Sequence, residues 1–264
     1  MIVSVVNHTS GLISDSDLQA AIRAVNRQLS EDFDLHWGMP ATLRLEGRRG
    51  TVNGAEAIVD ASNFSGEAVI YVWHPVEVST ALGFHARTHL GMPYGFVFPE
   101  VARQLGEPWT AALSHEALEI VADPEVNLMV MGPHPADPLR TVFHWYEICD
   151  AVQKDSYLID GVPVSNFLLP PYFTHADEPG SRNDFLGQME LAPPLPSFGV
   201  SPGGYVGFFD PLLGEHVKFF AESDLIARRR LSIKQQLGLA RRSVRYEFRT
   251  VANSPITAAL RRFI

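Results

Sequence analysis

An almost wholly apolar segment, EAVIYVWH at residues 67–74, limits the folds that this chain can adopt. It lacks the alternation of polar and apolar residues that marks a strand with one face in water. A strand of this kind is typical of the centre of a sheet, where both faces are buried. The segment therefore predicts a central strand, and with the helical segments around it we expect an α/β fold.

The N-terminal half contains further strand and helix signals. IVSVV at 2–6 predicts a buried strand, ATLRLEG at 41–47 a half-buried strand, and MPYGFVFPEV at 92–101, which Pro and Gly interrupt, an edge strand. Ser14 and Asp17 resemble a capping box, and the apolar repeat after them predicts a helix to about residue 30. EPWTAALSHEALEIVADP at 107–124 predicts a second helix, which Asp123-Pro124 ends.

The C-terminal half predicts two hairpins. After a loop to about residue 140, FHWYEICDAVQ at 143–153 indicates a short helix or a strand end. YLIDGVPVSNFLLPPYF at 157–173 predicts a hairpin with an Asp-Gly turn, and YVGFFDPLLGEHVKFF at 205–220 predicts another. We expect a domain at 1–174, a Pro/Gly-rich connector at 175–204, and a hairpin with a basic helical tail at 205–264.

Charge is distributed unevenly along the 264 residues, whose net charge is −9. From residue 227 onward there are 10 Lys and Arg and one acidic residue, whereas the rest holds 11 basic and 29 acidic residues. An acidic body does not favour nucleic-acid binding. We expect the tail to dock on the acidic body of the same chain; the alternatives are a solvated charged helix and a tail for anionic membranes or nucleic acid.

The chain has one cysteine, Cys149, so an internal disulfide is excluded. The N-terminal MIVSVVNHTSGL has no basic region and too short an apolar run for a signal peptide, and no segment reaches the length of a membrane span. We therefore expect a cytoplasmic protein.

The predicted helix at 107–124 carries the pattern His-Glu-x-x-Glu. His115 and Glu119 are four residues apart, so both can reach one metal ion from one face of the helix. Glu116 lies about 100° around the helix, in the position of the glutamate that activates a metal-bound water in His-Glu-x-x-His peptidases. The sequence therefore predicts a divalent metal site, with zinc as the expected ion; a solvated acidic helix face is the alternative.

Further ligands are expected from EICD at 147–150. Glu147 and Asp150 are three residues apart and would share a helix face, so that one could bind the metal while the other orients His115. His144 is a weaker candidate, and Cys149 is expected to be a small buried residue rather than a ligand.

Other polar and aromatic residues have less specific signals. We expect His85 and His89 to be solvent-facing loop residues, with substrate contact as the alternative. Tyr94 and Tyr157 are expected to be core or turn aromatics, although a tyrosine can also stabilise an oxyanion.

SHEALEIVADP, the following Trp145 and EICD together resemble a pattern of the plant EXORDIUM (phosphate-induced) family and of bacterial metallopeptidase-like relatives. The resemblance covers roughly residues 65–175, and its specific part is 114–150. It implies a zincin-like mixed sheet with an active-site helix and a metal site. The matching residues are Ser114, His115, Glu116, Glu119, Asp123, Pro124, Trp145, Glu147, Ile148 and Asp150.

These features together predict a metal-dependent hydrolase of peptide bonds, in which Glu116 activates the water. Its partner would be a peptide or protein substrate. The first alternative is a non-catalytic binding protein that a metal stabilises, for which a closed shell of four ligands would be typical. The second is an interaction module without a metal.

Overall fold

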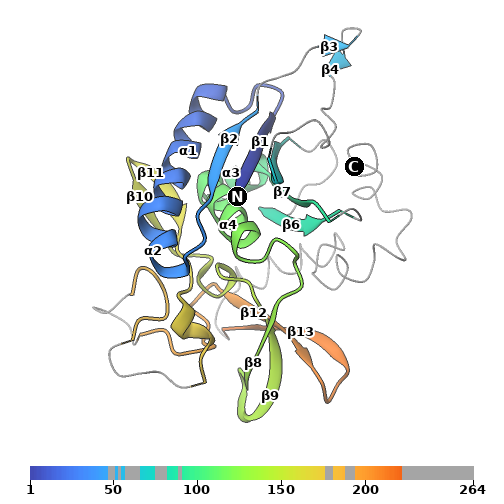
Figure 1. The fold of residues 1–264 in the computed structure, drawn as a ribbon, viewed down its shortest axis with the longest axis vertical. Coiled ribbons are helices and arrows are strands. Elements are labelled where there is room, and N and C mark those ends of the chain that lie inside the picture. Colours follow the sequence, from blue (N-terminus) through green and yellow to red (C-terminus); the bar gives the residue numbers. More distant parts are fainter. Residues whose placement is uncertain are drawn as a thin grey trace.

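In the computed structural model of this protein, the residues described are 1–46, 51–52, 55–56, 66–74, 82–88, 91–175, 181–187 and 194–221. They form the predicted α/β fold. A five-stranded sheet lies beside its helices, and a four-stranded antiparallel sheet lies at one end of the molecule (Figure 1).

The five-stranded sheet is parallel except at one edge. In spatial order its strands are β2 (Thr42–Leu45), β1 (Ile2–His8), β5 (Ala68–Trp73), β7 (Pro93–Val97) and β6 (Gly83–Arg87). Strand β6 is antiparallel to β7, and the other three pairings are parallel. The apolar segment at 67–74 thus forms the central strand β5, as predicted, because both of its faces are buried.

The predicted edge strand at 92–101 is wrong in position. Strand β7 lies between β5 and β6, and β6, which the sequence did not indicate, forms the edge. Pro93 is tolerated inside the sheet because it is the first residue of β7. Gly95 lies where helix α4 packs closely, since a Cβ there would be 3.1 Å from Cδ1 of Ile120. Proline and glycine therefore mark a strand start and a helix contact rather than an edge.

The helices are α1 (Asp15–Arg27), continued by a π-helical segment (Gln28–Phe33) and α2 (Asp34–Trp37), then α3 (Pro99–Leu105) and α4 (Trp109–Ala122). Two of them, α1 and α4, have the expected positions with shifted ends, whereas α2 and α3 were not predicted, and α3 begins inside the segment expected to be a strand. Ser14 caps α1, because its side chain accepts a hydrogen bond from the Asp17 amide at 3.1 Å. Helix α4 ends at Ala122, and the carboxylate of the next residue, Asp123, accepts amide hydrogen bonds from Asn127 and Leu128 and so fixes the following turn.

The four-stranded sheet replaces the loop expected up to residue 140, and of the two alternatives for 143–153 it confirms the strand end, since β9 (Asp137–Trp145) ends within that segment. Its order is β13 (Glu215–Phe220), β12 (Tyr205–Asp210), β9 and β8 (Met129–His134), and all its pairings are antiparallel. The hairpin predicted at 205–220 is confirmed as β12 and β13. The segment 129–145 is a hairpin that the Pro- and Met-rich composition concealed. Helical structure near EICD is limited to a 3-10 turn, Asp150–Val152.

Two smaller hairpins and a 3-10 turn complete the described structure. These are β3 (Thr51–Val52) with β4 (Ala55–Glu56), β10 (Ser156–Ile159) with β11 (Val162–Ser165), and the turn Pro170–Phe173. Asp160 and Gly161 connect β10 and β11 with φ of 51° and 79°, as the predicted Asp-Gly turn requires. The predicted basic tail and its docking lie outside the described residues, which end at 221.

Buried side chains lie on both faces of the five-stranded sheet. One cluster includes Val5, Ile70 and residues of α1 and α4, and the other includes Tyr71, Tyr94 and Phe96. Neighbouring residues of a strand point to opposite faces, so these clusters lie on opposite sides of the sheet. Helix α4 packs between β6, β7 and β11, which leaves most of its residues buried.

Candidate metal centre

Helix α4 carries the three polar residues of the His-Glu-x-x-Glu pattern. The helix is apolar and packs on several sides, and its buried residues include Leu113, Leu118 and Ile120. Glu116 and Glu119 are also buried, with exposures of 5% and 2%. Buried charges require partners, so the surroundings of these two carboxylates determine what the site can do.

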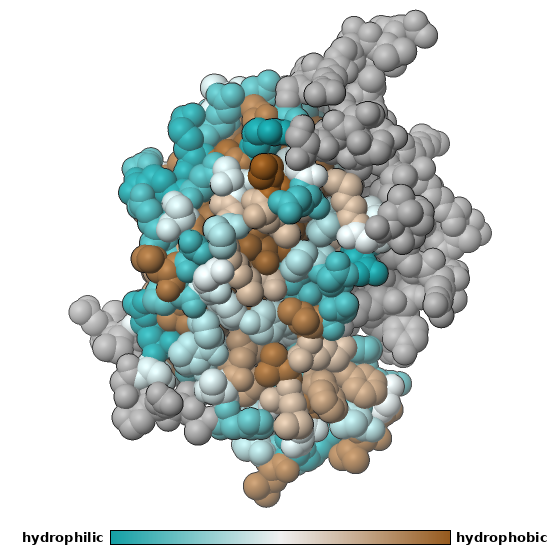
Figure 2. Space-filling model, in the orientation of Figure 1, coloured by the Kyte–Doolittle hydropathy of each residue, from teal (hydrophilic) through white to brown (hydrophobic). Residues whose placement is uncertain are grey.

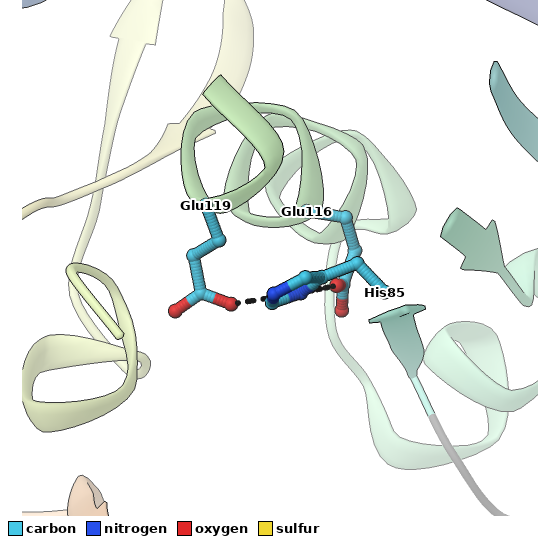
Figure 3. Close-up of side chains that lie close together, drawn as sticks. All are labelled: His85, Glu116 and Glu119. Atoms are coloured by element: carbon cyan, nitrogen blue, oxygen red, sulfur yellow. Dashed lines mark hydrogen bonds and ion pairs between the residues drawn. The ribbon is translucent and has the colours of Figure 1, made fainter. Parts of the chain in front are cut away.

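Strand β6 brings His85 against α4. His85 Nδ1 lies 3.1 Å from Glu116 Oε2 and 3.4 Å from Glu119 Oε2 (Figure 3). The strand can approach the helix because Gly83 has no side chain. A Cβ at that position would be 2.6 Å from Glu116 Oε1 and 2.8 Å from the Phe96 carbonyl oxygen.

Glu147 and Asp150, in the segment after β9, also approach the two histidines. Glu147 Oε2 lies 3.6 Å from His85 Nε2, and Asp150 Oδ1 lies 3.5 Å from His115 Nε2. The two residues do not share a helix face as expected, because Glu147 precedes the 3-10 turn that Asp150 begins. The irregular chain after β9 nevertheless directs both carboxylates toward the histidines.

These six residues form one buried group, the His–carboxylate cluster, made up of His85, His115, Glu116, Glu119, Glu147 and Asp150. Five of them expose no more than 7% of their surface, and the side chain of His115 exposes 12%. Substrate or solvent would therefore reach the cluster most readily at His115.

Glu119 occupies the middle of the cluster. Its Oε2 lies 3.2 Å from His115 Nε2 and 3.4 Å from His85 Nδ1, so both imidazoles face the same oxygen. Its other oxygen, Oε1, accepts a hydrogen bond of 3.2 Å from the amide of Cys149. This bond fixes the carboxylate and ties α4 to the segment that carries Glu147 and Asp150.

The electrostatic field of the cluster favours positive charge. Burial alone lowers the pKa of His115, but the charge of Glu119 and hydrogen bonds to Asp150 and Glu119 outweigh it, and the pKa is raised well above its ordinary value. A field that retains a proton on His115 also attracts a divalent cation.

Two neutral groups border the cluster. Tyr205, at the start of β12, donates a hydrogen bond to Asp150, and burial together with the charge of Asp150 raises the pKa of its hydroxyl well above the ordinary value. Burial, followed by the charges of Glu119 and Asp150, likewise raises the pKa of Cys149. The thiol therefore stays protonated, which agrees with the prediction of a small buried residue.

The separations of the nitrogen and oxygen atoms fit a metal ion. Bonds of 2.0–2.2 Å in a tetrahedral zinc site place neighbouring ligand atoms about 3.3 Å apart. His115, Glu119 and Asp150 form one group of three whose ligand atoms lie within 4.8 Å of one another, and His85, Glu116 and Glu119 form a second. The separations reported above, between 3.1 and 3.5 Å within these two groups, match that geometry.

The structure brings all five sequence-predicted site residues together and adds His85. The expectation that His85 is a solvent-facing loop residue is wrong, because it is a buried residue of β6. Its only sequence signal was the alternation in GFHAR, in which Phe84 and Ala86 face the opposite side of the sheet. His89 lies outside the described residues.

The remaining candidates lie away from the cluster. His144 Nε2 donates to the Pro133 carbonyl oxygen at 2.8 Å, and its ring packs on Phe198. Tyr94 belongs to the buried cluster on the other face of the sheet, as its expected core role requires. The Tyr157 hydroxyl donates to Asp32 at 2.6 Å.

Compared with known proteins, the chain matches no family model, no curated protein and no solved structure. Within the part of the chain that the structure describes, no helix combines the length and the apolar character needed to cross a bilayer.

Proposed function

We propose that this protein is a metal-dependent hydrolase that cleaves peptide bonds at the His–carboxylate cluster. The observation that carries the proposal is the convergence of two imidazoles and four carboxylates in one buried group with separations of 3.1–3.6 Å. Two parts of the proposal rest on the resemblance of residues 114–150 to metallopeptidase-like proteins. These are the peptide bond as the substrate and the zincin-like fold.

His115, Glu119 and Asp150 would hold the ion. They offer one nitrogen and two carboxylate oxygens, a donor set suited to zinc and also acceptable to other divalent cations. When bound, the ion would supply Lewis-acid chemistry, by which it polarises a substrate carbonyl and acidifies water.

Glu116 is the residue that we propose as the general base. It lies one residue after His115 on α4, and its carboxylate is directed toward the cluster, 3.1 Å from His85 Nδ1. Glu116 would accept a proton from the attacking water, and His85 would fix the orientation of its carboxylate. Gly83 maintains this arrangement by leaving space beside Glu116 Oε1.

Several residues would orient the ligands without touching substrate. The Cys149 amide holds Glu119, and the Tyr205 hydroxyl holds Asp150. Hydrogen bonds of this kind fix the direction in which a ligand presents its lone pairs, and their removal weakens metal binding.

The deep burial of the cluster favours one alternative, a metal-stabilised binding protein without catalysis. A structural ion is enclosed by its ligands, whereas a catalytic ion keeps a position open to water. Only His115 exposes more than a tenth of its side chain, so the access route is narrow. In this alternative, metal would raise stability, and no peptide would be cleaved.

Peptide hydrolysis by the zinc-loaded protein tests the proposal. Turnover of a mixed peptide library is measured by mass spectrometry for the wild type and for Glu116→Gln. We expect the substitution to lower turnover about 10²–10⁴-fold, the usual contribution of a general base.

Glu31→Gln is the matched control, because Glu31 is an exposed helical glutamate that pairs with Arg27 far from the cluster in sequence. It should leave turnover unchanged. Wild-type protein that binds zinc, melts at a higher temperature with it and cleaves no peptide would contradict the hydrolase and favour the binding protein.

A further inference from the structure

The structure contains two groups of residues, each of which could hold a metal ion, and they share Glu119. We propose that the His–carboxylate cluster binds two divalent cations, with Glu119 as the shared ligand and with His85 and Glu116 completing the second position. The inference rests on the proposed function, since it adds an ion to the same site.

Each set consists of one histidine and two carboxylates. The first is His115, Glu119 and Asp150; the second is His85, Glu116 and Glu119. In the second set, His85 Nδ1 is 3.1 Å from Glu116 Oε2 and 3.4 Å from Glu119 Oε2, again close to the spacing of about 3.3 Å in a tetrahedral zinc site. The two sets thus have the same composition and similar separations.

The position of Glu119 makes it a bridging ligand. Its Oε2 faces both imidazoles, at 3.2 and 3.4 Å, while its Oε1 is held by the Cys149 amide. The two histidines come from different elements, α4 and β6. A carboxylate placed between two such nitrogens can contribute to an ion on either side.

The charge of the cluster also fits two ions better than one. Its four carboxylates give a formal charge of −4 when both imidazoles are neutral, as metal ligation requires. One divalent ion would leave a net charge of −2 on these six buried residues, and two ions would balance it. Net charge in a buried site is costly, so the neutral state is favoured.

The environment of His85 supports an ion rather than a simple hydrogen bond. Three carboxylates surround this one ring: Glu116 and Glu119 face Nδ1, and Glu147 lies 3.6 Å from Nε2. An N–H group satisfies one acceptor well, whereas a cation beside Nδ1 attracts both carboxylates. The carboxylate that faces Nε2 would fix the orientation of the ring, as the second shell of a ligating histidine commonly does.

This assignment adds a role to Glu116: the second ion, in place of a hydrogen bond from His85, would fix the orientation of its carboxylate, and its proposed role as base would remain. One of its oxygens, Oε2, would contribute to the second ion. The other, Oε1, lies beside Gly83 and would remain able to accept a proton.

Metal stoichiometry tests the inference. Protein freed of metal with a chelator is titrated with Zn²⁺ alone, and the bound metal is measured by elemental analysis after free metal is removed. We expect two ions per chain in the wild type and one in His85→Ala. His36→Ala, which removes an exposed histidine, should retain two.

A measurement without a substitution guards against a variant that fails to fold. Wild-type protein loaded with Mn²⁺ is examined by electron paramagnetic resonance. Two ions that share Glu119 should be exchange coupled, which alters the hyperfine pattern of an isolated ion.

The outcomes separate the two proposals. One ion per chain in the wild type, or two that persist in His85→Ala, would overturn the second position. If the wild type binds one ion and His85→Ala still binds it, the first metal position and the proposed function stand. A wild type that binds no metal would overturn both.

Discussion

The five-stranded sheet is buried on both faces, whereas the four-stranded sheet leaves one face partly open to solvent. Ile70, in the centre of the first sheet, is fully buried. On the second sheet, Met131 and Phe143 are paired neighbours, and they expose 52% and 37% of their surfaces. Figure 2 shows apolar residues gathered at the lower end of the molecule, where Figure 1 places β8, β9 and β12.

The difference bears on how the His–carboxylate cluster is built. The five-stranded sheet and α4 supply His85, His115, Glu116 and Glu119 from regular, well-packed elements. The segments at the ends of β9 and β12 supply Glu147, Asp150 and the Tyr205 hydroxyl. Well-packed helix and strand residues thus form one part of the site. Residues at or just beyond the ends of strands of the four-stranded sheet form the rest.

The largest expected effect comes from the centre of the five-stranded sheet. Ile70→Ala should lower the free energy of unfolding by about 2–5 kcal/mol, because it leaves a cavity in a core that cannot collapse fully. Met131→Ala, on the half-exposed face, should cost well under half as much. Urea unfolding of both variants measures this, and equal losses would mean that the two sheets do not differ in packing.

A pH-dependent effect is expected in the four-stranded sheet. Burial lowers the pKa of His144 to about 4, although its hydrogen bond to the Pro133 carbonyl opposes the shift. Between pH 6.5 and 4 the unfolded chain therefore binds a proton that the folded chain does not, and stability falls as the pH falls. Across that window the loss is about 3 kcal/mol, and above it His144 contributes nothing.

His144→Gln checks this prediction, because glutamine does not titrate. Its stability should decline less steeply than that of the wild type between pH 6.5 and 4.5 in urea unfolding. Parallel curves would show that His144 does not cause the acid sensitivity.

Two glycines offer a matched pair, one in each sheet. A side chain at Gly83 would press on Glu116 and the Phe96 carbonyl, and one at Gly207 would clash with the ring of Trp145. Alanine at either position should cost about 1–3 kcal/mol by overpacking. Only Gly83→Ala should also weaken zinc binding, because it displaces Glu116. A similar loss of zinc affinity in Gly207→Ala would show that the metal site depends on the packing of the four-stranded sheet as much as on that of the five-stranded sheet.

The smallest effect is expected at the exposed end of β9. Leu139 exposes 97% of its surface, so Leu139→Ser should change the free energy of unfolding by no more than about 0.5 kcal/mol. Thermal unfolding measures the change. A larger loss would mean that Leu139 is covered in solution.

Local patterns in the sequence determined several features of this protein. The apolar run at 67–74 fixed a central strand, Ser14 fixed the start of α1, and Asp160-Gly161 fixed a hairpin turn. The spacing of His115 and Glu119 placed both on one helix. Each of these follows from interactions within a few residues, which is why the sequence alone was sufficient.

Only the tertiary structure decided how the cluster is completed. His85 lies 31 residues before Glu116, and nothing local in GFHAR indicates that β6 is the edge strand beside α4. Glu147 and Asp150 converge because an irregular segment, not a helix, directs them, and Tyr205 arrives because β12 pairs with β9. These positions depend on strand pairing between distant segments. Because the packing of the whole chain selects that pairing, no short sequence pattern predicts it.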